Sequence, residues 1–509
     1  MKTLPRIALF FAAIKILLHL ATADNLGFQR DEFLYLALGR HLDWGFWSNP
    51  PFIGFVGWLS QTLFGDSLWA TRLLPALLGG GLILLVGIMV RDLGGGRFAQ
   101  ILSGTAMLFS IAWLRTFSML QPVPFDVFFW TLLSFGLLKW LKTNDVRWWW
   151  FIGAAAGVGF LNKYSIAFWA AALLTALLLT PQRRVLATRM PWLAAALALL
   201  IILPNFVWQW QHNFPVVNHM GELARNQLDN VQPVNFLLDQ FLFHGAGAAV
   251  WLAGLVFLLR VPAMRQYRLL GWFYVAIVLI FLAFSGKSYY TLGAYPVLFA
   301  AGAVWWERFL KKTWSRTALI AAVVLLALPL FPTGVPIWPA ERLVPYFEKL
   351  TGAGIVAVRW EDGELHPLPQ DYADMLGWPE LAALVQKADE RADTNPYLIY
   401  GENYGQAGAV EHYFRKNGRC VEVASFADSY RLWAPDTIPS NVETLIYIND
   451  DEPGEDVQAL FADIQLVGRI ENPLARERGT GVWLCRSPRS SAAEFWAERA
   501  KMVKAVFRR

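Results

Sequence analysis

Charged residues are scarce in this sequence of 509 residues: Asp, Glu, Lys and Arg make up 16% of it, whereas hydrophobic residues make up 56%. Soluble globular chains carry about 25% charged residues, because a surface that faces water needs them. Cysteine is scarcer still, with two residues in the whole chain. Two cysteines exclude a disulfide framework and any metal or iron–sulfur site built from several thiolates. The composition therefore excludes an ordinary soluble enzyme and a small disulfide-stabilised domain.

Motifs of several common enzyme classes are also missing. The sequence contains no P-loop, no GxSxG nucleophile elbow and no HExxH zinc motif. The seven histidines are scattered, and no pair has the spacing of metal ligands. His212 and His219 share one predicted loop, but we do not expect them to bind a metal. We therefore predict no metal cofactor.

The net charge of +5 is unevenly distributed along the chain. Residues 1–339 carry 25 basic and 12 acidic residues, whereas residues 340–509 carry 19 basic and 27 acidic residues. A basic first part joined to a mildly acidic second part differs from the concentrated basic surface of a nucleic-acid-binding protein. No nucleic-acid partner is predicted.

Apolar runs close to the ~20 residues that cross a bilayer recur through the first two thirds of the chain. They predict a polytopic α-helical membrane protein with about eleven transmembrane helices and a C-terminal α/β domain. Residues 1–339 would form the membrane domain, with a first external loop at about 24–68, and residues 340–509 the soluble domain. The predicted spans are 4–23, 69–90, 98–118, 122–141, 148–162, 164–181, 191–210, 241–259, 269–286, 289–306 and 317–333.

Lys and Arg are concentrated in every second loop, which indicates the orientation of the chain. With the N-terminus inside, 17 of the basic residues before residue 340 lie in the inside set, and eight do not. This predicts a cytoplasmic N-terminus, a multi-pass protein of the cell (inner) membrane and an extracytoplasmic C-terminal domain. Residues 21–23 resemble a signal-peptide cleavage site, but Lys15 interrupts the apolar run, so we favour an uncleaved first helix.

The C-terminal part alternates short apolar runs with amphipathic segments, which is typical of an α/β domain. Cys420 and Cys485 both lie at the ends of predicted strands. In an oxidising compartment they could form a disulfide, and two separate thiols are an equal alternative. The predicted strands are 397–400, 420–425, 444–448, 465–470 and 481–485, and the predicted helices are 379–391, 405–417, 455–463 and 491–506.

An acidic pair, Asp31 and Glu32, opens the loop after the first span. Residues 31–42 have helical periodicity with one apolar face, as in a helix lying on the outer membrane surface. Acids at a helix N-terminus can simply cap it. They can also supply a catalytic base. Carboxylates are energetically costly close to a membrane, so those that are present there often have a function.

Asp126 is the only acid between Asp92 and Asp145, and it opens a predicted span on the same outer side as Asp31. Pro122 and Pro124 supply a helix start, which would place Asp126 in the first turn. A first-turn acid can merely satisfy the helix dipole. A second acid on the side of Asp31 nevertheless favours a functional role for both.

Two lysines with hydroxylated neighbours lie on the same predicted side. Lys163 precedes Tyr164 and Ser165, and Lys287 precedes Ser288, Tyr289 and Tyr290. An ammonium flanked by hydroxyl groups suits a phosphate. The alternative is a lysine that extends to the membrane interface without binding a ligand.

The order of these segments resembles glycosyltransferase family 39. That family belongs to the GT-C superfamily of membrane transferases that use lipid-phosphate sugars, and it includes protein O-mannosyltransferases and the lipid A aminoarabinose transferase. The likeness covers about residues 25–300. The residues that carry it are Asp31, Glu32, Phe33, Tyr35, Gly39, Gly45, Asn49, Pro50, Pro51, Arg72, Leu73, Phe125, Asp126, Phe128, Phe129, Trp130, Phe160, Leu161, Asn162, Lys163, Tyr164, Lys287, Ser288, Tyr289, Tyr290, Tyr295 and Pro296.

The resemblance implies a polyprenyl-phosphate-linked sugar as donor and a glycan, lipid or protein as acceptor. It implies that Asp31 is the catalytic base and that Asp126 is a second functional acid. We assign Glu32 to the same site, where Glu32 and Asp126 would orient the substrate or the base. Many relatives carry the second acid a few residues earlier than Asp126, and many carry His or Lys where this chain has Asn49. The expected phosphate-binding set is therefore Asn49, Lys163, Lys287, Tyr289 and Tyr290.

Attack opposite a departing phosphate would invert the anomeric centre. A lipid or glycolipid transporter (flippase) is the competing class. In a transporter we would expect polar residues in the middle of the spans and inverted repeats in the sequence. Here the distinctive polar residues cluster at the outer ends of spans and no repeat is visible, so a transferase is the preferred hypothesis.

Overall fold

The computed structural model describes residues 6–226, 232–392 and 396–507. Its contacts divide the chain into two compact units. Unit 1 comprises Met1–Ala23, Arg72–Val207 and Met220–Val335, and unit 2 comprises Asp24–Thr71, Trp208–His219 and Pro336–Arg509. The segment after the first helix thus folds with the C-terminal part of the chain.

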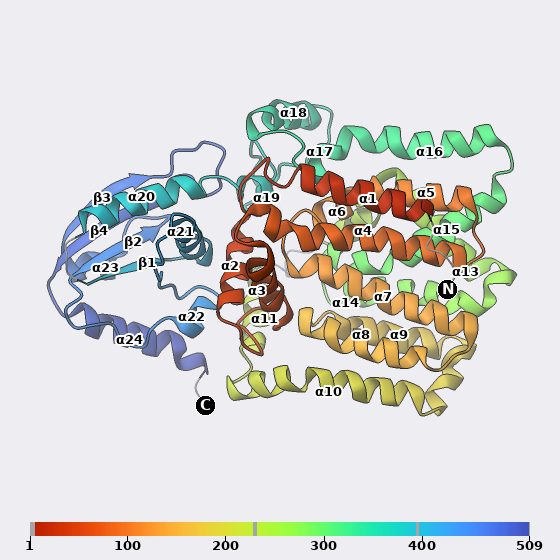
Figure 1. The fold of residues 1–509 in the computed structure, drawn as a ribbon, viewed down its shortest axis with the longest axis horizontal. Coiled ribbons are helices and arrows are strands. Elements are labelled where there is room, and N and C mark those ends of the chain that lie inside the picture. The colour runs from red at the N-terminus through yellow and green to blue at the C-terminus, as the bar shows by residue number, and fades with distance from the viewer. Residues whose placement is uncertain (1–5, 227–231, 393–395, 508–509) are drawn as a thin grey trace. The chain divides into compact units, whose positions relative to one another are not determined.

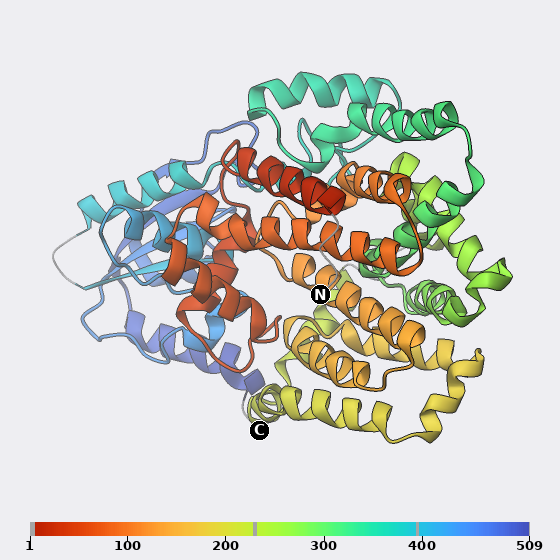
Figure 2. The same ribbon diagram turned by 45° about the vertical axis from the view of Figure 1, so that its right-hand side comes forward.

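Unit 1 is helical, and its long helices run alongside one another (Figures 1 and 2). They enclose a core of buried aromatic and aliphatic side chains. The elements here are α1 (Arg6–Ala21), α4 (Leu68–Asp92), α5 (Arg97–Leu108), α6 (Ile111–Thr116), α7 (Pro122–Thr143), α8 (Trp148–Asn162), α9 (Ile166–Leu178), η1 (Pro181–Ala187), α10 (Met190–Gln211), α11 (Pro215–Asn226), α12 (Pro233–Leu242), η3 (Gly245–Gly247), α13 (Ala248–Arg260), η4 (Pro262–Tyr267), α14 (Arg268–Ala283), η5 (Ser288–Ala294), α15 (Pro296–Phe309), α16 (Thr313–Ala327), η6 (Leu328–Leu330) and α17 (Phe331–Gly334).

Among the described residues, five helices are long and apolar enough to cross a membrane. Counting two sharply bent helix pairs as one span each raises the number to seven. The five are Leu68–Asp92, Pro122–Thr143, Met190–Gln211, Pro262–Ala283 and Thr313–Gly334; the bent pairs are Ile166–Leu178 with Pro181–Ala187, and Pro233–Leu242 with Gly245–Arg260. The chain is therefore a predominantly helical, membrane-spanning protein.

The prediction of a continuous helix at 98–118 is wrong, because the segment breaks between α5 and α6. The predicted spans at 241–259 and 289–306 are also interrupted, the first by the bend after α12 and the second between η5 and α15. The break between α5 and α6 is stabilised by a distant segment, because the Ala112 N–H donates to the Phe243 carbonyl at 3.1 Å. The Ser110 hydroxyl also lies 2.8 Å from Nδ1 of His244. Backbone groups left by a helix break need such partners, and hydropathy alone cannot reveal them.

Glycine allows the close packing of α13 against α15. A Cβ atom on Gly254 would lie 2.0 Å from the Leu298 carbonyl oxygen, and one on Gly302 would lie 1.8 Å from that of Val250. The two backbones are therefore in direct contact, as is common where membrane helices pack through small residues.

Unit 2 contains a four-stranded sheet in the order β1–β2–β4–β3. Strand β1 (Tyr397–Gly401) pairs with β2 (Thr444–Asn449) in parallel, and the pairs of β4 (Gly481–Pro488) with β2 and with β3 (Phe461–Arg469) are antiparallel. Helices α20 and α24 cover opposite faces of the sheet (Figure 1). The helices of this part are α18 (Ala340–Gly352), α19 (Gln370–Ala373), α20 (Trp378–Arg391), α21 (Tyr404–Lys416), α22 (Tyr430–Trp433), α23 (Glu455–Leu460), α24 (Ala492–Lys504) and η7 (Ala505–Phe507).

The predicted strand at 420–425 is wrong, whereas the other four predicted strands are present. In place of a strand, residues 420–425 make one isolated bridge, between Tyr400 and Ala424. Cys420 and Cys485 are both free thiols, the first exposed and the second buried. The structure therefore agrees with two separate thiols.

The predicted helix after the first span is α2 (Arg30–Arg40), but it is not a surface helix. Residues Glu32–Gly39 are all buried, and α2 packs against α3 (Phe52–Phe64) and α21. Phe55, Trp58 and Leu63 on α3 are exposed instead. The exposed apolar surface of this segment thus belongs to the next helix along the chain.

Candidate functional site

The N-terminus of α2 fixes the acidic pair. Gln29 is the N-cap, and its side-chain oxygen accepts a hydrogen bond from the backbone N–H of Asp31 at 2.8 Å. The Glu32 carboxylate accepts in return from the backbone N–H of Gln29 at 2.9 Å. This capping box uses Glu32, which is fully buried, and leaves the Asp31 carboxylate to other partners.

Asp31 is held by a tyrosine from the C-terminal part of unit 2. The Tyr404 hydroxyl donates to Oδ1 of Asp31 at 2.7 Å. The Arg30 guanidinium lies 3.6 Å from the same oxygen and 5.4 Å from the centre of the Tyr404 ring. Burial, followed by the Asp31 charge, raises the pKa of Tyr404, so the phenol keeps its proton and remains a donor. The sequence analysis predicted Asp31 as a site residue but missed its partner Tyr404, because Tyr404 belongs to no recognisable motif.

A second buried acid, Asp374, lies in the same electrostatic network. Burial raises the pKa of Asp374 to about 6, although Arg30 and Arg476 oppose the change. Nη1 of Arg476 donates to its carboxylate oxygens at 3.2 and 3.3 Å. Arg30 is thus a cation shared between Asp31 and Asp374.

Asn49 is held by partners other than those of Asp31. Its side-chain amide donates to Oγ of Ser48 at 2.7 Å, and the Ser48 hydroxyl donates to Oδ1 of Asp428 at 3.0 Å. These contacts hold the segment before Pro50 and Pro51 against the chain at Asp428. They give Asn49 a structural role and do not test its predicted role in phosphate binding.

Asp126 belongs to unit 1, and the prediction that it lies in the first turn of its helix is wrong. Helix α7 begins at Pro122 and has no acid in its first turn. Asp126 is buried and accepts a short hydrogen bond from the Ser165 hydroxyl. The indole N–H of Trp130 lies 3.4 Å from the same hydroxyl oxygen. Asp126 therefore does not cap its helix, and Ser165 is a partner that the sequence analysis missed.

The structure brings Lys163, Tyr289 and Tyr290 together in unit 1. Lys163 lies in the break between α8 and α9, and its Nζ atom is 5.2 Å and 4.7 Å from the ring centres of Tyr289 and Tyr290. Its charge also acts on Asp126, and Lys287 lies close enough for the two ammonium groups to repel each other. Five of the predicted site residues thus belong to one cluster: Lys163 at the break, Lys287, Tyr289 and Tyr290 at the start of η5, and Asp126 on α7.

The aromatic rings of Tyr289 and Tyr290 lie next to Lys163 in this cluster. The Tyr289 and Tyr290 rings are edge to face, with centres 4.8 Å apart. Next to Lys287, the Ser288 hydroxyl donates to Oδ2 of Asp239 at 2.6 Å. Two ammonium groups beside phenols and hydroxyls can bind a phosphate, and the aromatic faces hold Lys163 in place.

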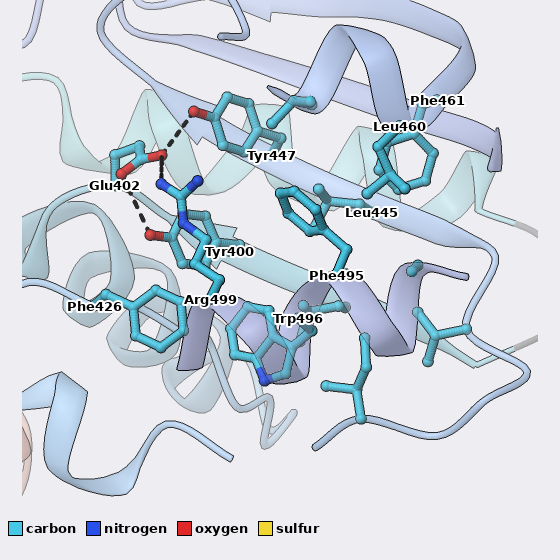
Figure 3. Close-up of a pocket in the computed structure, with 15 residues that line it drawn as sticks. Tyr400, Glu402, Phe426, Leu445, Tyr447, Leu460, Phe461, Phe495, Trp496 and Arg499 are labelled. Carbon is cyan, nitrogen blue, oxygen red and sulfur yellow. Dashed lines mark hydrogen bonds and ion pairs between the residues drawn. The ribbon is translucent and has the colours of Figure 1, made fainter. Parts of the chain in front are cut away.

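Figure 3 shows a cavity of unit 2 between α24 and the sheet. Its wall is aromatic and aliphatic, and Glu402 lies at one end. The Tyr447 and Tyr400 hydroxyls donate to the Glu402 carboxylate at 2.8 and 3.3 Å. None of the predicted site residues lines this cavity.

Among the described residues, no group of three or more His, Cys, Asp or Glu side chains could hold a metal ion. The expectation that no metal is needed stays a prediction.

Comparison with known proteins identifies the class of the chain. A family model described as dolichyl-phosphate-mannose-protein mannosyltransferase matches residues 48–208. The lipid A galacturonosyltransferase RgtD of Rhizobium johnstonii is 26% identical over 339 residues, which cover 63% of this chain and 69% of that protein. The chain is a membrane glycosyltransferase.

Solved structures share the fold of this glycosyltransferase. ArnT from Cupriavidus metallidurans bound to undecaprenyl phosphate matches with a TM-score of 0.63 and 18% identity, over 93% of this chain and 97% of that one. The same protein in the apo state matches with a TM-score of 0.62 over the same shares of the two chains. The aligned part therefore covers most of this chain.

Proposed function

We propose that this glycosyltransferase moves a sugar from a polyprenyl-phosphate donor to an acceptor hydroxyl on the outer side of a bacterial inner membrane. Support for the donor comes from the undecaprenyl phosphate bound to the ArnT structure. Support for a glycolipid acceptor comes from the relative that is described as acting on lipid A. A free glycan or a protein hydroxyl is the alternative acceptor.

The hydrogen bonding and the exposure of the Asp31 carboxylate are the main support for the proposal. Oδ1 accepts from Tyr404, and among the described residues no hydrogen bond reaches Oδ2. The side chain is 29% exposed, so a substrate can approach it. A carboxylate fixed at one oxygen and accessible at the other has the geometry of a general base.

In the proposed reaction Asp31 takes the proton of the acceptor hydroxyl, whose oxygen attacks the anomeric carbon. The bond between that carbon and the phosphate oxygen breaks, and its electron pair leaves with the lipid phosphate. Attack from the opposite side inverts the anomeric centre. Phosphate is already a good leaving group, so positive charge is needed more than a strong acid.

We assign that charge to Lys287 and Lys163, with Tyr289 and Tyr290 donating hydrogen bonds and Asn49 as a further polar contact. Glu32 orients the base through the capping box, and Asp126 orients substrate or Lys163. We assign the Asp31 cluster of unit 2 and the Lys163 cluster of unit 1 to one reaction because of the sequence resemblance.

We further propose eleven spans with a cytoplasmic N-terminus, a membrane domain at residues 1–339 and an extracytoplasmic domain at 340–509. The bias of Lys and Arg towards alternate loops supports this topology. Short helices in the structure, such as α1 and α15, would then cross the membrane together with the longer ones.

Transfer by the purified protein tests the proposal directly. The full chain is reconstituted in liposomes with an undecaprenyl-phosphate sugar and a glucosamine-based glycolipid, and the products are analysed by mass spectrometry. A product heavier by one sugar is expected. Movement of the donor between leaflets without any new glycosidic bond would instead identify a flippase.

A further inference from the structure

A second cavity of unit 2 has a chemistry that the proposed reaction does not use. It has a volume of about 490 Å³, within the ~300–1,000 Å³ range of small-molecule sites. The loop after α2, the end of α10, the segment around α22 and the end of α24 build it together. Four segments far apart in sequence therefore form one hollow.

Two tryptophans with buried indole N–H groups line this cavity. Trp208 stacks on His212 with ring centres 4.1 Å apart, and Trp433 stacks on His41 at 4.3 Å. Among the described residues, neither indole N–H has a hydrogen-bond partner, although both are shielded from water. Buried donors without partners are costly, so a ligand that accepts hydrogen bonds is favoured here.

The charged groups of the cavity disfavour an anion. Asp43, Asp436 and Lys504 line it. The Lys504 ammonium is already engaged, because it lies 2.7 Å from Oδ1 of Asp436 and also donates to the Ala434 carbonyl. Among the described residues that line the cavity, Asp43 therefore leaves one net negative charge. This charge repels a phosphate or a uronic acid and attracts hydroxyl or amino donors.

The cavity wall is built around Trp208. A Cβ atom on Gly45 would lie 2.3 Å from Cε3 of Trp208, so only glycine lets the indole pack against this backbone. The Asn213 side chain donates to the Val506 carbonyl at 3.1 Å and fixes the C-terminal segment next to it. The aromatic surface is therefore preformed.

We propose that this cavity binds an uncharged or amino-bearing sugar ring of the acceptor. The C–H face of a sugar packs on an indole, its hydroxyls donate to Asp43 and Asp436, and its ring or hydroxyl oxygens accept from the indole N–H groups. The inference rests on the proposed function, because it identifies the acceptor as a glycan or the sugar headgroup of a glycolipid.

Saturation-transfer NMR on the full-length protein, in a detergent without a sugar headgroup, tests the proposal. The probes are a soluble glucosamine disaccharide and, as the anionic comparison, glucose 1-phosphate. The disaccharide should bind with a millimolar dissociation constant, and glucose 1-phosphate should bind at least several-fold more weakly. Trp433→Ala should weaken disaccharide binding about tenfold, and the isosteric Asp43→Asn should weaken it as well.

Two controls make the result decisive. Trp338→Ala removes a partly exposed tryptophan outside the cavity and should leave binding unchanged. Adding the lipid-linked donor should not displace the disaccharide. Equal binding by the wild type and both cavity variants, or displacement by the donor, would overturn the proposal. The measurement needs no turnover, so loss of sugar binding and loss of transfer are separate results.

Discussion

At the scale of single residues, the contact between Asp31 and Tyr404 shows how the C-terminal part of the chain reaches the proposed base. The two residues are 373 positions apart. The carboxylate could be predicted because acids are rare in the first 339 residues of the chain, whereas a tyrosine in a helix of the C-terminal part is ordinary. Tyr404 is a positioning residue: it holds one oxygen of Asp31 and leaves the other accessible.

Tyr404→Phe should therefore lower turnover more than it raises the Michaelis constant. A hydrogen bond to a charged group contributes ~1.5–3 kcal/mol, so kcat should fall about 10- to 100-fold. Tyr413→Phe, on the same helix, is the matched control and should retain turnover. A Tyr404→Phe enzyme with wild-type kcat and pH profile would show that the contact is only structural.

Substitutions of Lys287 distinguish between two roles of this residue, phosphate binding and membrane anchoring. If it binds the departing phosphate, Lys287→Ala should lower kcat/KM for the lipid donor about 30- to 1,000-fold. Lys287→Arg should also lower kcat/KM for the lipid donor, because the planar guanidinium of arginine differs in shape from the compact ammonium of lysine.

Lys142→Ala is the control for Lys287, since Lys142 pairs with Asp92 at 2.8 Å and has no assigned role. Donor kinetics on the three variants decide the matter. Near-wild-type values for both Lys287 variants would leave Lys163 as the phosphate ligand.

At the scale of elements, hydropathy and periodicity predicted most helices and four of the five strands. They failed where distant contacts decide the outcome. The 98–118 segment breaks where the Phe243 carbonyl accepts a hydrogen bond from the Ala112 N–H and the His244 ring pairs with the Ser110 hydroxyl. Asp126 is a different case: α7 begins at Pro122, as the predicted span did, so residue 126 already lies beyond the first turn.

The start of α2 is the element on which the base depends. Gln29→Ala removes the acceptor of the Asp31 N–H and half of the capping box, at a cost of ~1 kcal/mol. Hydrogen exchange on the full chain should then be about fivefold faster in the first turn of α2. Gln386→Ala, at an exposed position of α20, should leave exchange in α2 unchanged; unchanged exchange in Gln29→Ala itself would mean that packing alone holds the turn.

At the scale of the whole molecule, the chain folds as two units, and the first loop lies in the same unit as the C-terminal sheet. The sequence could not predict this pairing. The partly buried ion pair between Arg40 and Glu411, for example, joins residues 371 positions apart. The clusters of predicted site residues could be found from the sequence, whereas their partners Tyr404, Ser165 and Asp239 could not.

The orientation of the chain is a prediction for the whole molecule. A reporter enzyme that works only outside the cytoplasm should be active when fused after Arg509. It should be inactive when fused at Arg184, because that loop belongs to the inside set of basic residues. The opposite pattern would place Asp31 in the cytoplasm and contradict every assignment made for the outer side.

The most direct test of the account is single-turnover sugar transfer by Asp31→Asn. An amide cannot accept the acceptor's proton, so the rate of transfer should fall by about 100- to 10,000-fold. Donor binding and thermal stability should stay close to wild type, as should the transfer rate of Asp145→Asn in an exposed turn. A folded Asp31→Asn protein that binds donor and transfers sugar at the wild-type rate would contradict the account.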